Sequence, residues 1–310
     1  MKTSLSFKEL KEKKAPDPEF IIITAKAILR GDPFSESYGR RKLSPLRTNS
    51  SNSLLKFILV FSTLYVLFSV QIKTTNYQPK KPVTRNIVMV HGAFVDGSGW
   101  KPAYDILTRA GYHVTIVQQP LTSFAGDLAA VKRVIDLQDG PCILVAHSYG
   151  GAIITEAGND SKVVGLVFIA AHAPDKGESE AGNGQHYPSA YKSLIKGADG
   201  FDYINPTMFA QDFAGDLPKE IADFEANAQV PTADAVFHAI IQNPAWRTKP
   251  SWYLVAGSDR IINPDLERMY AKRANSQKVE IAGASHSVYQ SHPKDIARLI
   301  IAAASQPKTN

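Results

Sequence analysis

Cysteine is almost absent from this chain, and the common sequence signals of bound cofactors are absent as well. Cys142 is the only cysteine among 310 residues, so no internal disulfide can form, and its apolar neighbours predict a buried strand residue. The histidines are scattered and do not show the spacing of metal ligands. The chain has neither a Walker-type nor a GxGxxG phosphate loop, and Gly97-Ser98-Gly99 resembles a glycine-rich loop only superficially. We therefore expect no metal and no bound cofactor.

The excess of positive charge lies at one end of the chain. The formal net charge is +6, but basic residues gather within residues 1–85 and the remainder is nearly balanced. Such a basic tail is usually solvated or faces a membrane surface. Basic and aromatic residues are not interleaved here as they are in nucleic-acid grooves. We predict no nucleic-acid partner, and the sequence leaves the oligomeric state open.

The N-terminal part of the chain lacks the pattern of a folded domain. Residues 1–53 are charged, Ser-rich and weakly periodic, which indicates a disordered extension or a segment upstream of the natural start. Residues 54–72 hold an apolar run that is uncharged after Lys56 and at the short end of what spans a bilayer. A cleaved signal peptide and an uncleaved signal anchor both fit this run. Residues 73–85 are typical of a linker.

The apolar run also predicts where the rest of the chain is found. A buried core helix would show a polar face, and this run has none. We expect a secreted or periplasmic protein, or one tethered to a membrane through residues 54–70 with its folded domain outside the cytoplasm.

From residue 86 onward, apolar runs of strand length alternate with helical patterns. Most of the runs are continuously apolar, which is typical of parallel strands covered by helices on both faces. We predict strands at 87–90, 114–117, 143–146, 163–169, 252–256 and 279–281, and helices around 100–110, around 127–137, from 149 and at 293–304. The sequence therefore predicts an α/β domain over residues 86–304, built on a mostly parallel sheet.

A long insertion interrupts the strand pattern. Residues 173–248 are rich in Pro, Asp and aromatic side chains, and we expect them to form a helical cap over one end of the sheet. Five aromatic residues of this cap either line a pocket or form the core of the cap, which is the commoner role: Tyr187, Tyr203, Phe209, Phe213 and Trp246.

The strongest local signal is Ala146-His147-Ser148-Tyr149-Gly150-Gly151, between a predicted strand and a predicted helix. It matches the nucleophile elbow G-x-S-x-G except at Ala146, which is still small. A serine N-cap would explain the start of the helix but not the small residues on both sides. Ser148 is therefore the predicted nucleophile.

A serine hydroxyl needs a base beside it and an acid that orients the base. In proteins built around this elbow the chain order is Ser, then Asp or Glu, then His. Asp259 and His286 follow that order, and each comes just after a late strand, where catalytic loops gather. Asp265 is the alternative acid, but its place after Pro264 predicts a residue in the first turn of a helix.

The other histidines are weaker candidates for the base. His292 precedes Pro293 at the start of the last helix, where a surface cap explains it. His147 adjoins the nucleophile, and neighbours on a sharp turn point in different directions. The remaining rivals do not follow the last strand: His113, His172, His186 and His238.

The developing oxyanion needs backbone N–H donors. One should come from Tyr149, the residue after the nucleophile, and another from the loop after the first core strand. That loop reads His91-Gly92-Ala93-Phe94, and its glycine lets the backbone approach a substrate closely. We predict Ala93 as the second donor, with Phe94 as the alternative.

Four segments, HGAFVDGSGW, AHSYGG, AGSDRIINP and GASHSVYQSHP, together resemble the capped α/β-hydrolase superfamily over residues 86–304. They look like the branch of small serine esterases that includes plant methyl-ester hydrolases and bacterial relatives with secretory leaders. The resemblance implies an α/β-hydrolase fold with a cap. It also implies a carboxylic-ester hydrolase that acts on small, apolar substrates through an acyl-enzyme.

Departures from related branches narrow this expectation. Epoxide hydrolases and haloalkane dehalogenases of the superfamily carry an Asp nucleophile where this chain has Ser148. The related hydroxynitrile lyases carry a Lys after the catalytic histidine, where this chain has Ser287. The resemblance thus implies ester hydrolysis, with cofactor-free perhydrolysis and ligand binding without catalysis as the alternatives.

Overall fold

The computed structural model describes residues 84–306. The predicted N-terminal extension, the apolar run and nearly all of the linker therefore lie outside the described residues. Within the described part, no helix is both long enough and apolar enough to cross a membrane.

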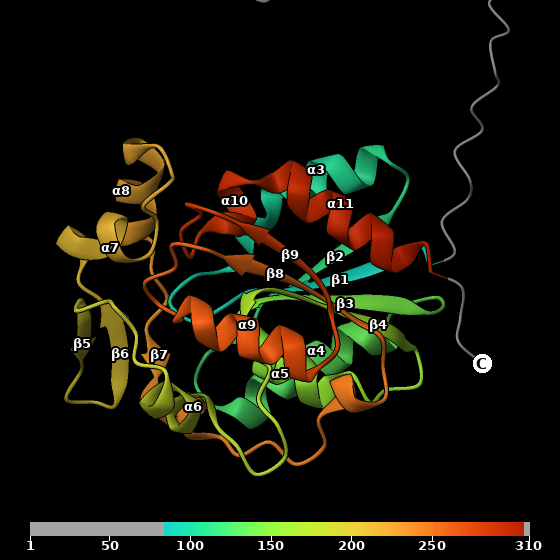
Figure 1. Ribbon diagram of the computed structural model, residues 1–310, viewed down its shortest axis with the longest axis horizontal. Coiled ribbons are helices and arrows are strands. Elements are labelled where there is room, and N and C mark those ends of the chain that lie inside the picture. Colours follow the sequence, from blue (N-terminus) through green and yellow to red (C-terminus); the bar gives the residue numbers. More distant parts are fainter. Residues whose placement is uncertain (1–83, 307–310) are drawn as a thin grey trace, which may run out of the picture. The chain divides into compact units, whose positions relative to one another are not determined.

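Six parallel strands form the central sheet, in the order β2-β1-β3-β4-β8-β9 (Figure 1). Their bounds are β1 (Asn86–Val90), β2 (His113–Val117), β3 (Cys142–Ser148), β4 (Val163–Ala171), β8 (Ser251–Ala256) and β9 (Gln277–Ile281). Every residue of β1, β3 and β8 is buried, which explains why these runs are apolar throughout. The edge strand β9 is exposed along most of its length. Each predicted strand thus has a counterpart in the sheet.

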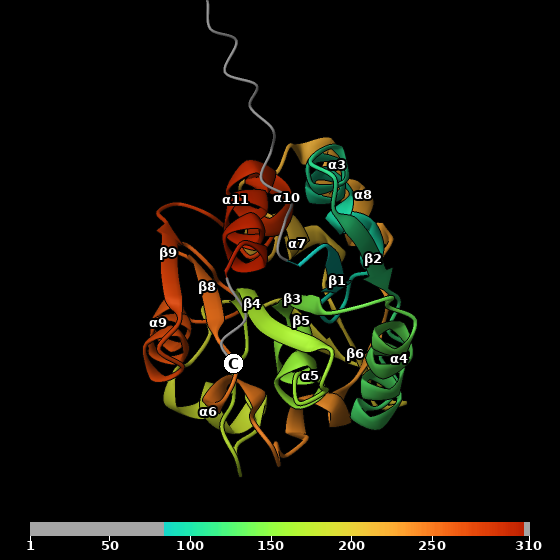
Figure 2. The ribbon, with the colours of Figure 1, turned by 90° about the vertical axis from the view of Figure 1, so that its right-hand side faces the viewer.

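Helices cover both faces of this sheet. One face carries α3 (Lys101–Arg109), α10 (Val288–Ser291) and α11 (Pro293–Ala304), and Figure 2 shows that face above the strands. The other face carries α4 (Phe124–Asp136), α5 (Gly150–Ala157) and α9 (Pro264–Arg273). Two buried apolar clusters result, one around Trp100 and Trp252 and the other around Phe168 and Tyr253. The mostly parallel, two-faced sheet agrees with the sequence prediction.

The insertion between β4 and β8 contains more than the predicted helices. It holds α6 (Glu180–His186), α7 (Pro206–Asp212) and α8 (Lys219–Asn227), and also a three-stranded antiparallel sheet of β5 (Leu194–Lys196), β6 (Phe201–Ile204) and β7 (Thr232–Ala233). The insertion also holds short 3-10 helices at Asp234–His238 and Ala245–Arg247, and another lies after β1 at Gly97–Trp100. The expectation of a helical cap is therefore corrected to a mixed cap. Its strands have only two to four residues, too few for a hydrophobic period to show in the sequence.

Candidate active site

Ser148 ends β3 on a sharp turn into α5. Its φ is +55°, a left-handed conformation that is uncommon for a residue with a side chain and marks local strain. A Cβ added at Gly150 would lie 2.6 Å from the carbonyl oxygen of His91, and one at Gly151 would lie 2.1 Å from that of His172. Gly150 and Gly151 must be small because the turn packs against the backbone that follows β1 and β4.

Ser148, Asp259 and His286 come from three separate loops and form a continuous hydrogen-bonded chain. Nε2 of His286 lies 2.8 Å from Oγ of Ser148, and Nδ1 of His286 lies 2.6 Å from Oδ2 of Asp259. The other carboxylate oxygen of Asp259 accepts hydrogen bonds from the backbone N–H groups of Ile261 and Ile262, at 2.7 and 2.9 Å. The side chains of His286 and Asp259 are fully buried, so water does not compete for these bonds. The structure thus brings together the three residues predicted as a triad.

A second carboxyl, that of Glu267 on α9, is buried near Asp259. One of its oxygens accepts a hydrogen bond from the backbone N–H of Ala256 at 3.0 Å. Burial, and then the negative charge of Asp259, raise the pKa of Glu267 well above its usual range. Burial therefore disfavours a second negative charge beside Asp259.

His147 supports the loop that carries His286 through a hydrogen bond and ring stacking. Its Nε2 donates a hydrogen bond to the carbonyl oxygen of His286 at 2.9 Å, and its ring stacks on Tyr289 with centroids 4.2 Å apart. Burial, helped by the nearby His286, holds the pKa of His147 well below the ordinary value. His147 is therefore a neutral donor that positions the loop, a role that the sequence did not indicate.

The rival residues lie where the sequence places them. His292 contacts Oγ of Ser291 at 2.8 Å, and 33% of its side chain is exposed. Asp265 is in the first turn of α9 and pairs with Arg268 at 2.6 Å. Within residues 84–306, only His286 places a ring nitrogen within hydrogen-bond distance of Oγ of Ser148.

The predicted oxyanion donors lie beside the nucleophile. Ala93 lines the same cavity as Ser148, and Tyr149 adjoins Ser148 in the chain. Within the described residues, neither the N–H of Ala93 nor that of Tyr149 donates a hydrogen bond to the protein. The N–H of Phe94, the alternative donor, is occupied because it donates to Oγ1 of Thr232 at 3.0 Å. This geometry favours Ala93 over Phe94.

The buried side chains of His91 and Asp127 hold in place the residues that carry these N–H donors. Nε2 of His91 accepts a hydrogen bond from the N–H of Gln119 at 2.9 Å, while its Nδ1 lies 2.9 Å from the carbonyl oxygen of Gly92. The hydroxyl of Tyr149 donates to Asp127 at 2.7 Å. The role of Asp127 could not be read from the sequence, because its partner lies 22 residues further along the chain.

A cavity of about 260 Å³ lies beside Ser148. The loop after β1 contributes Ala93 and Phe94 to it, and the cap contributes two aromatic residues that the sequence did not single out, Tyr191 and Phe237. The rest of the lining is partly apolar and partly charged: His172, Glu180, Ala181, Gly184, Ser189, Leu194, Lys196, Asp202, Asp234, His238, Ile261, Ile262 and Leu266. Apolar side chains make up much of the lining, and charged side chains are placed among them.

The five cap aromatics named from the sequence do not line this cavity. Phe209, Phe213 and Trp246 are buried in the main apolar cluster, and Tyr187 packs against that cluster. Tyr203 is 36% exposed. For the three buried residues, the core role is therefore confirmed over the pocket role.

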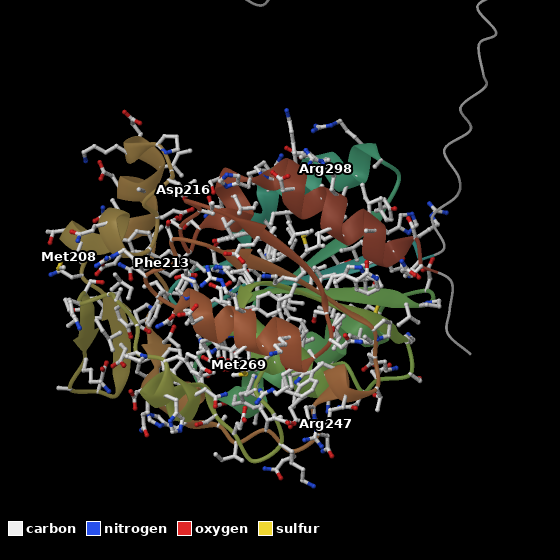
Figure 3. The ribbon with its side chains drawn as sticks, viewed as in Figure 1. Met208, Phe213, Asp216, Arg247, Met269 and Arg298 are labelled. Carbon is white, nitrogen blue, oxygen red and sulfur yellow. The ribbon has the colours of Figure 1, made fainter. Side chains whose placement is uncertain are left out.

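The segment after α7 supports the histidine from the cap. The ring of Phe213 packs edge-on against His286, with ring centroids 4.7 Å apart. Asp216 accepts hydrogen bonds from the hydroxyls of Ser285 and Ser291, on either side of the histidine. Figure 3 labels Phe213 and Asp216 on the segment between α7 and α8. The sequence did not indicate this contact because it joins segments about 70 residues apart.

Metal binding finds no support in the described part of the chain. No group of three or more His, Cys, Asp or Glu side chains within residues 84–306 is arranged to hold an ion. The thiol of Cys142 is buried in β3, and burial raises its pKa to about 12.

Comparisons with known proteins agree with this architecture. A family model described as "Alpha/beta hydrolase family" matches residues 87–299. An "AB hydrolase superfamily protein" of Gibberella zeae is 25% identical over 136 residues, which are 44% of this chain. The aligned part spans 42% of the length of that relative.

Two solved structures are similar over nearly their whole length. A pyrethroid hydrolase from Sphingobium faniae JZ-2 matches with a TM-score of 0.62 and 20% identity, covering 72% of this chain and 98% of that one. A methylesterase from Arabidopsis matches with a TM-score of 0.60 and 18% identity, covering 71% and 98%. At these identities the likeness shows the fold, which is the α/β-hydrolase fold.

Proposed function

Because the chain belongs to the alpha/beta hydrolase family, we propose that it is a serine hydrolase that cleaves carboxylic esters of small substrates. One observation carries this proposal. The ring of His286 joins Oγ of Ser148, at 2.8 Å, to the carboxylate of Asp259, at 2.6 Å. This is the arrangement that turns a weak serine hydroxyl into a nucleophile near neutral pH. The names of the similar pyrethroid hydrolase and methylesterase support hydrolysis and an ester substrate.

The proposed reaction is acyl transfer in two steps. Nε2 of His286 removes the proton from Ser148, and the alkoxide attacks the ester carbonyl to form a tetrahedral intermediate. The N–H groups of Ala93 and Tyr149 hold the oxyanion, and each such donor stabilises it by about 3 kcal/mol. His286 then protonates the departing alcohol, which leaves the acyl group on Ser148. In the second step His286 activates a water molecule that releases the acid.

Asp259 keeps its negative charge throughout the proposed cycle. Its carboxylate fixes the imidazole in the tautomer that presents Nε2 to the serine, and stabilises the imidazolium when it forms. The N–H groups of Ile261 and Ile262 hold its other oxygen in place.

The test is covalent labelling together with burst kinetics. The protein should release a burst of p-nitrophenol from p-nitrophenyl acetate and should react with a fluorophosphonate probe. Both should be lost in Ser148→Ala. The matched control is Ser189→Ala, because Ser189 lines the same cavity but its hydroxyl donates to the carbonyl of Ile261 at 2.6 Å. That variant should keep the label.

Normal turnover by Ser148→Ala would overturn the proposal. Binding of esters without turnover across an ester panel would favour a ligand-binding protein on a hydrolase scaffold. The complete hydrogen-bonded triad supports catalysis over binding alone.

We also propose that the hydrolase domain functions outside the cytoplasm, either released or tethered through residues 54–70. The apolar run after Lys56 supports this proposal, although it lies outside the described residues. N-terminal sequencing of the mature protein tests it. Cleavage after the run supports release, and an intact run in a membrane fraction supports a tether. An intact run in the soluble cytoplasmic fraction would contradict both.

A further inference from the structure

Two buried carboxyl groups line the cavity beside Ser148, and the proposed mechanism uses neither. Glu180 belongs to α6 and its side chain is 6% exposed. Asp202 belongs to β6 and is 1% exposed. Both line the cavity that contains Ser148. Acidic groups are rarely buried to this extent unless something satisfies them.

Each of these carboxyls has one oxygen without a partner among the described residues, although Asp202 also lies within hydrogen-bond reach of the carboxyl of Asp234. Oε1 of Glu180 and Oδ2 of Asp202 have no hydrogen-bond partner within residues 84–306. The other oxygen of Glu180 lies 3.5 Å from Nε2 of His172, a long contact. More than nine in ten buried polar groups in folded proteins are hydrogen-bonded. Two unpaired oxygens around one cavity therefore indicate a ligand that supplies their missing hydrogen bonds.

Glu180 and Ser148 both contact His172. The backbone N–H of His172 donates to the carbonyl oxygen of Ser148 at 3.1 Å, because β3 and β4 pair where the elbow begins. The side chain of the same histidine faces Glu180. One residue therefore separates the nucleophile from the buried acid.

The charges around the cavity favour particular ligand groups. Burial raises the pKa of Glu180 well above its usual range and lowers the pKa of His172 to about 3, so burial disfavours the charged form of each. Burial also raises the pKa of Asp202. Lys196 is bound to Asp234 at 2.8 Å and is not free to neutralise a ligand's negative charge. A charged group on the substrate would leave water without a buried opposite charge to offset the loss, whereas an uncharged hydroxyl can hydrogen-bond to the unpaired oxygens.

We propose that this cavity selects esters that carry a hydroxyl group, which Glu180 and Asp202 hold beside the scissile ester. This inference rests on the proposed ester hydrolysis at Ser148. It replaces the expectation of an apolar substrate with that of a polar one. The apolar walls at Ile261, Ile262 and Leu266 contact the carbon chain of the same substrate.

The experiment compares esters of equal length. The acyl series is methyl butyrate, methyl 3-hydroxybutyrate and monomethyl succinate. The alcohol series is butyl acetate and 3-hydroxybutyl acetate. Acid release in a pH-stat gives kcat/KM for each. In at least one series, the hydroxyl ester should exceed the plain ester about tenfold, the worth of one hydrogen bond to a buried group. Monomethyl succinate should fall below methyl butyrate.

Variants then assign the preference to the two carboxyls. Glu180→Met and Asp202→Leu remove the hydrogen bonds, and each should lower the ratio of hydroxyl to plain ester. Glu180→Gln keeps a donor and an acceptor and should preserve most of the ratio. The matched control is Glu225→Met on α8. Glu225 also has a buried oxygen without a partner among the described residues, but it lines a different groove, so the ratio should not change.

The outcomes separate this inference from the proposed function. Turnover of all esters with equal kcat/KM in both series would overturn the inference and leave the hydrolase proposal standing. An unchanged ratio in both Glu180→Met and Asp202→Leu would also overturn it. Absence of turnover for every ester would instead count against the proposed function. Thermal melting of each variant shows whether it is folded, and Glu180→Gln tests the site if Glu180→Met is not.

Discussion

The strands of the parallel sheet are stabilised by burial and backbone pairing, whereas the cap depends more on side chains that reach it from the core. Strands β1, β3 and β8 are buried along their whole length and pair through backbone hydrogen bonds. The cap strands have two to four residues, and side chains from the core help to hold the cap in place. Arg260, directly after the predicted triad acid, binds Asp212 of the cap at 2.9 Å, and its carbonyl oxygen accepts from the N–H of Tyr191 at 2.8 Å.

The residues proposed for catalysis come from the sheet, and the residues proposed for substrate selectivity come from the cap. Ser148, Asp259 and His286 all follow strands of the core, so the rigid sheet sets their distances. Glu180 and Asp202, which we propose to select the substrate, come from the cap. A change in the core should therefore affect turnover of every ester, and a change in the cap should affect stability or preference.

The largest expected effect is in the core. Asp259→Asn keeps the size of the side chain but stabilises the wrong tautomer of His286, and kcat should fall roughly 10⁴-fold. Turnover of p-nitrophenyl acetate measures it. The control is Asp265→Asn, on the exposed first turn of α9, which should leave kcat within about twofold because surface substitutions rarely matter. Equal losses in the two variants would contradict the assignment of the acid.

An intermediate effect is expected where the cap meets the histidine. Phe213→Ala removes a fully buried ring that packs on His286, and should destabilise the fold by about 3–5 kcal/mol. Urea unfolding at neutral pH measures it. Phe224→Ala is the matched control within the same cap, because Phe224 is 69% exposed and its loss should change stability by less than about 0.5 kcal/mol. Similar values for the two variants would show that the cap does not support the site.

The smallest effect on stability is expected at β9, the exposed edge strand of the core sheet, where ion pairs add to the backbone pairing of the strands. Hydrogen bonds from Arg268, then from Lys278, lower the pKa of Glu280 to about 2. A carboxyl with a lowered folded pKa stabilises the protein above its unfolded pKa, about 4.3, and this contribution is lost as pH falls through about 2. Glu280→Gln should therefore cost about 0.5 kcal/mol at pH 7 and nothing below pH 2.

The free energies of unfolding of the unsubstituted protein and of Glu280→Gln, measured at pH 7 and pH 3, check this prediction. The difference between the two free energies should be smaller at pH 3. A gap that widens on acidification would contradict the assigned direction of the shift.

The sequence predicted the core well because its signals are local. The buried central strands carry continuous apolar runs, and Pro293 marks the start of α11 at the predicted residue. Ser148 and His286 were found from small residues, chain order and position after strands. The cap could not be predicted to the same depth. Strands of two to four residues have no measurable period, and the contact of Phe213 with His286 depends on how the chain returns over the sheet.

The sequence by itself determined the parallel α/β core, the identity of the predicted nucleophile, acid and base, and the small residues that the elbow requires. Local chemistry is enough for these features, since burial period and turn geometry act over a few residues. Only the tertiary structure decided which N–H groups stay free for an oxyanion, and that Asp127 and His147 position the site. It also placed two buried carboxyls around the cavity of Ser148. These features depend on contacts between segments far apart in the chain, which no local pattern encodes.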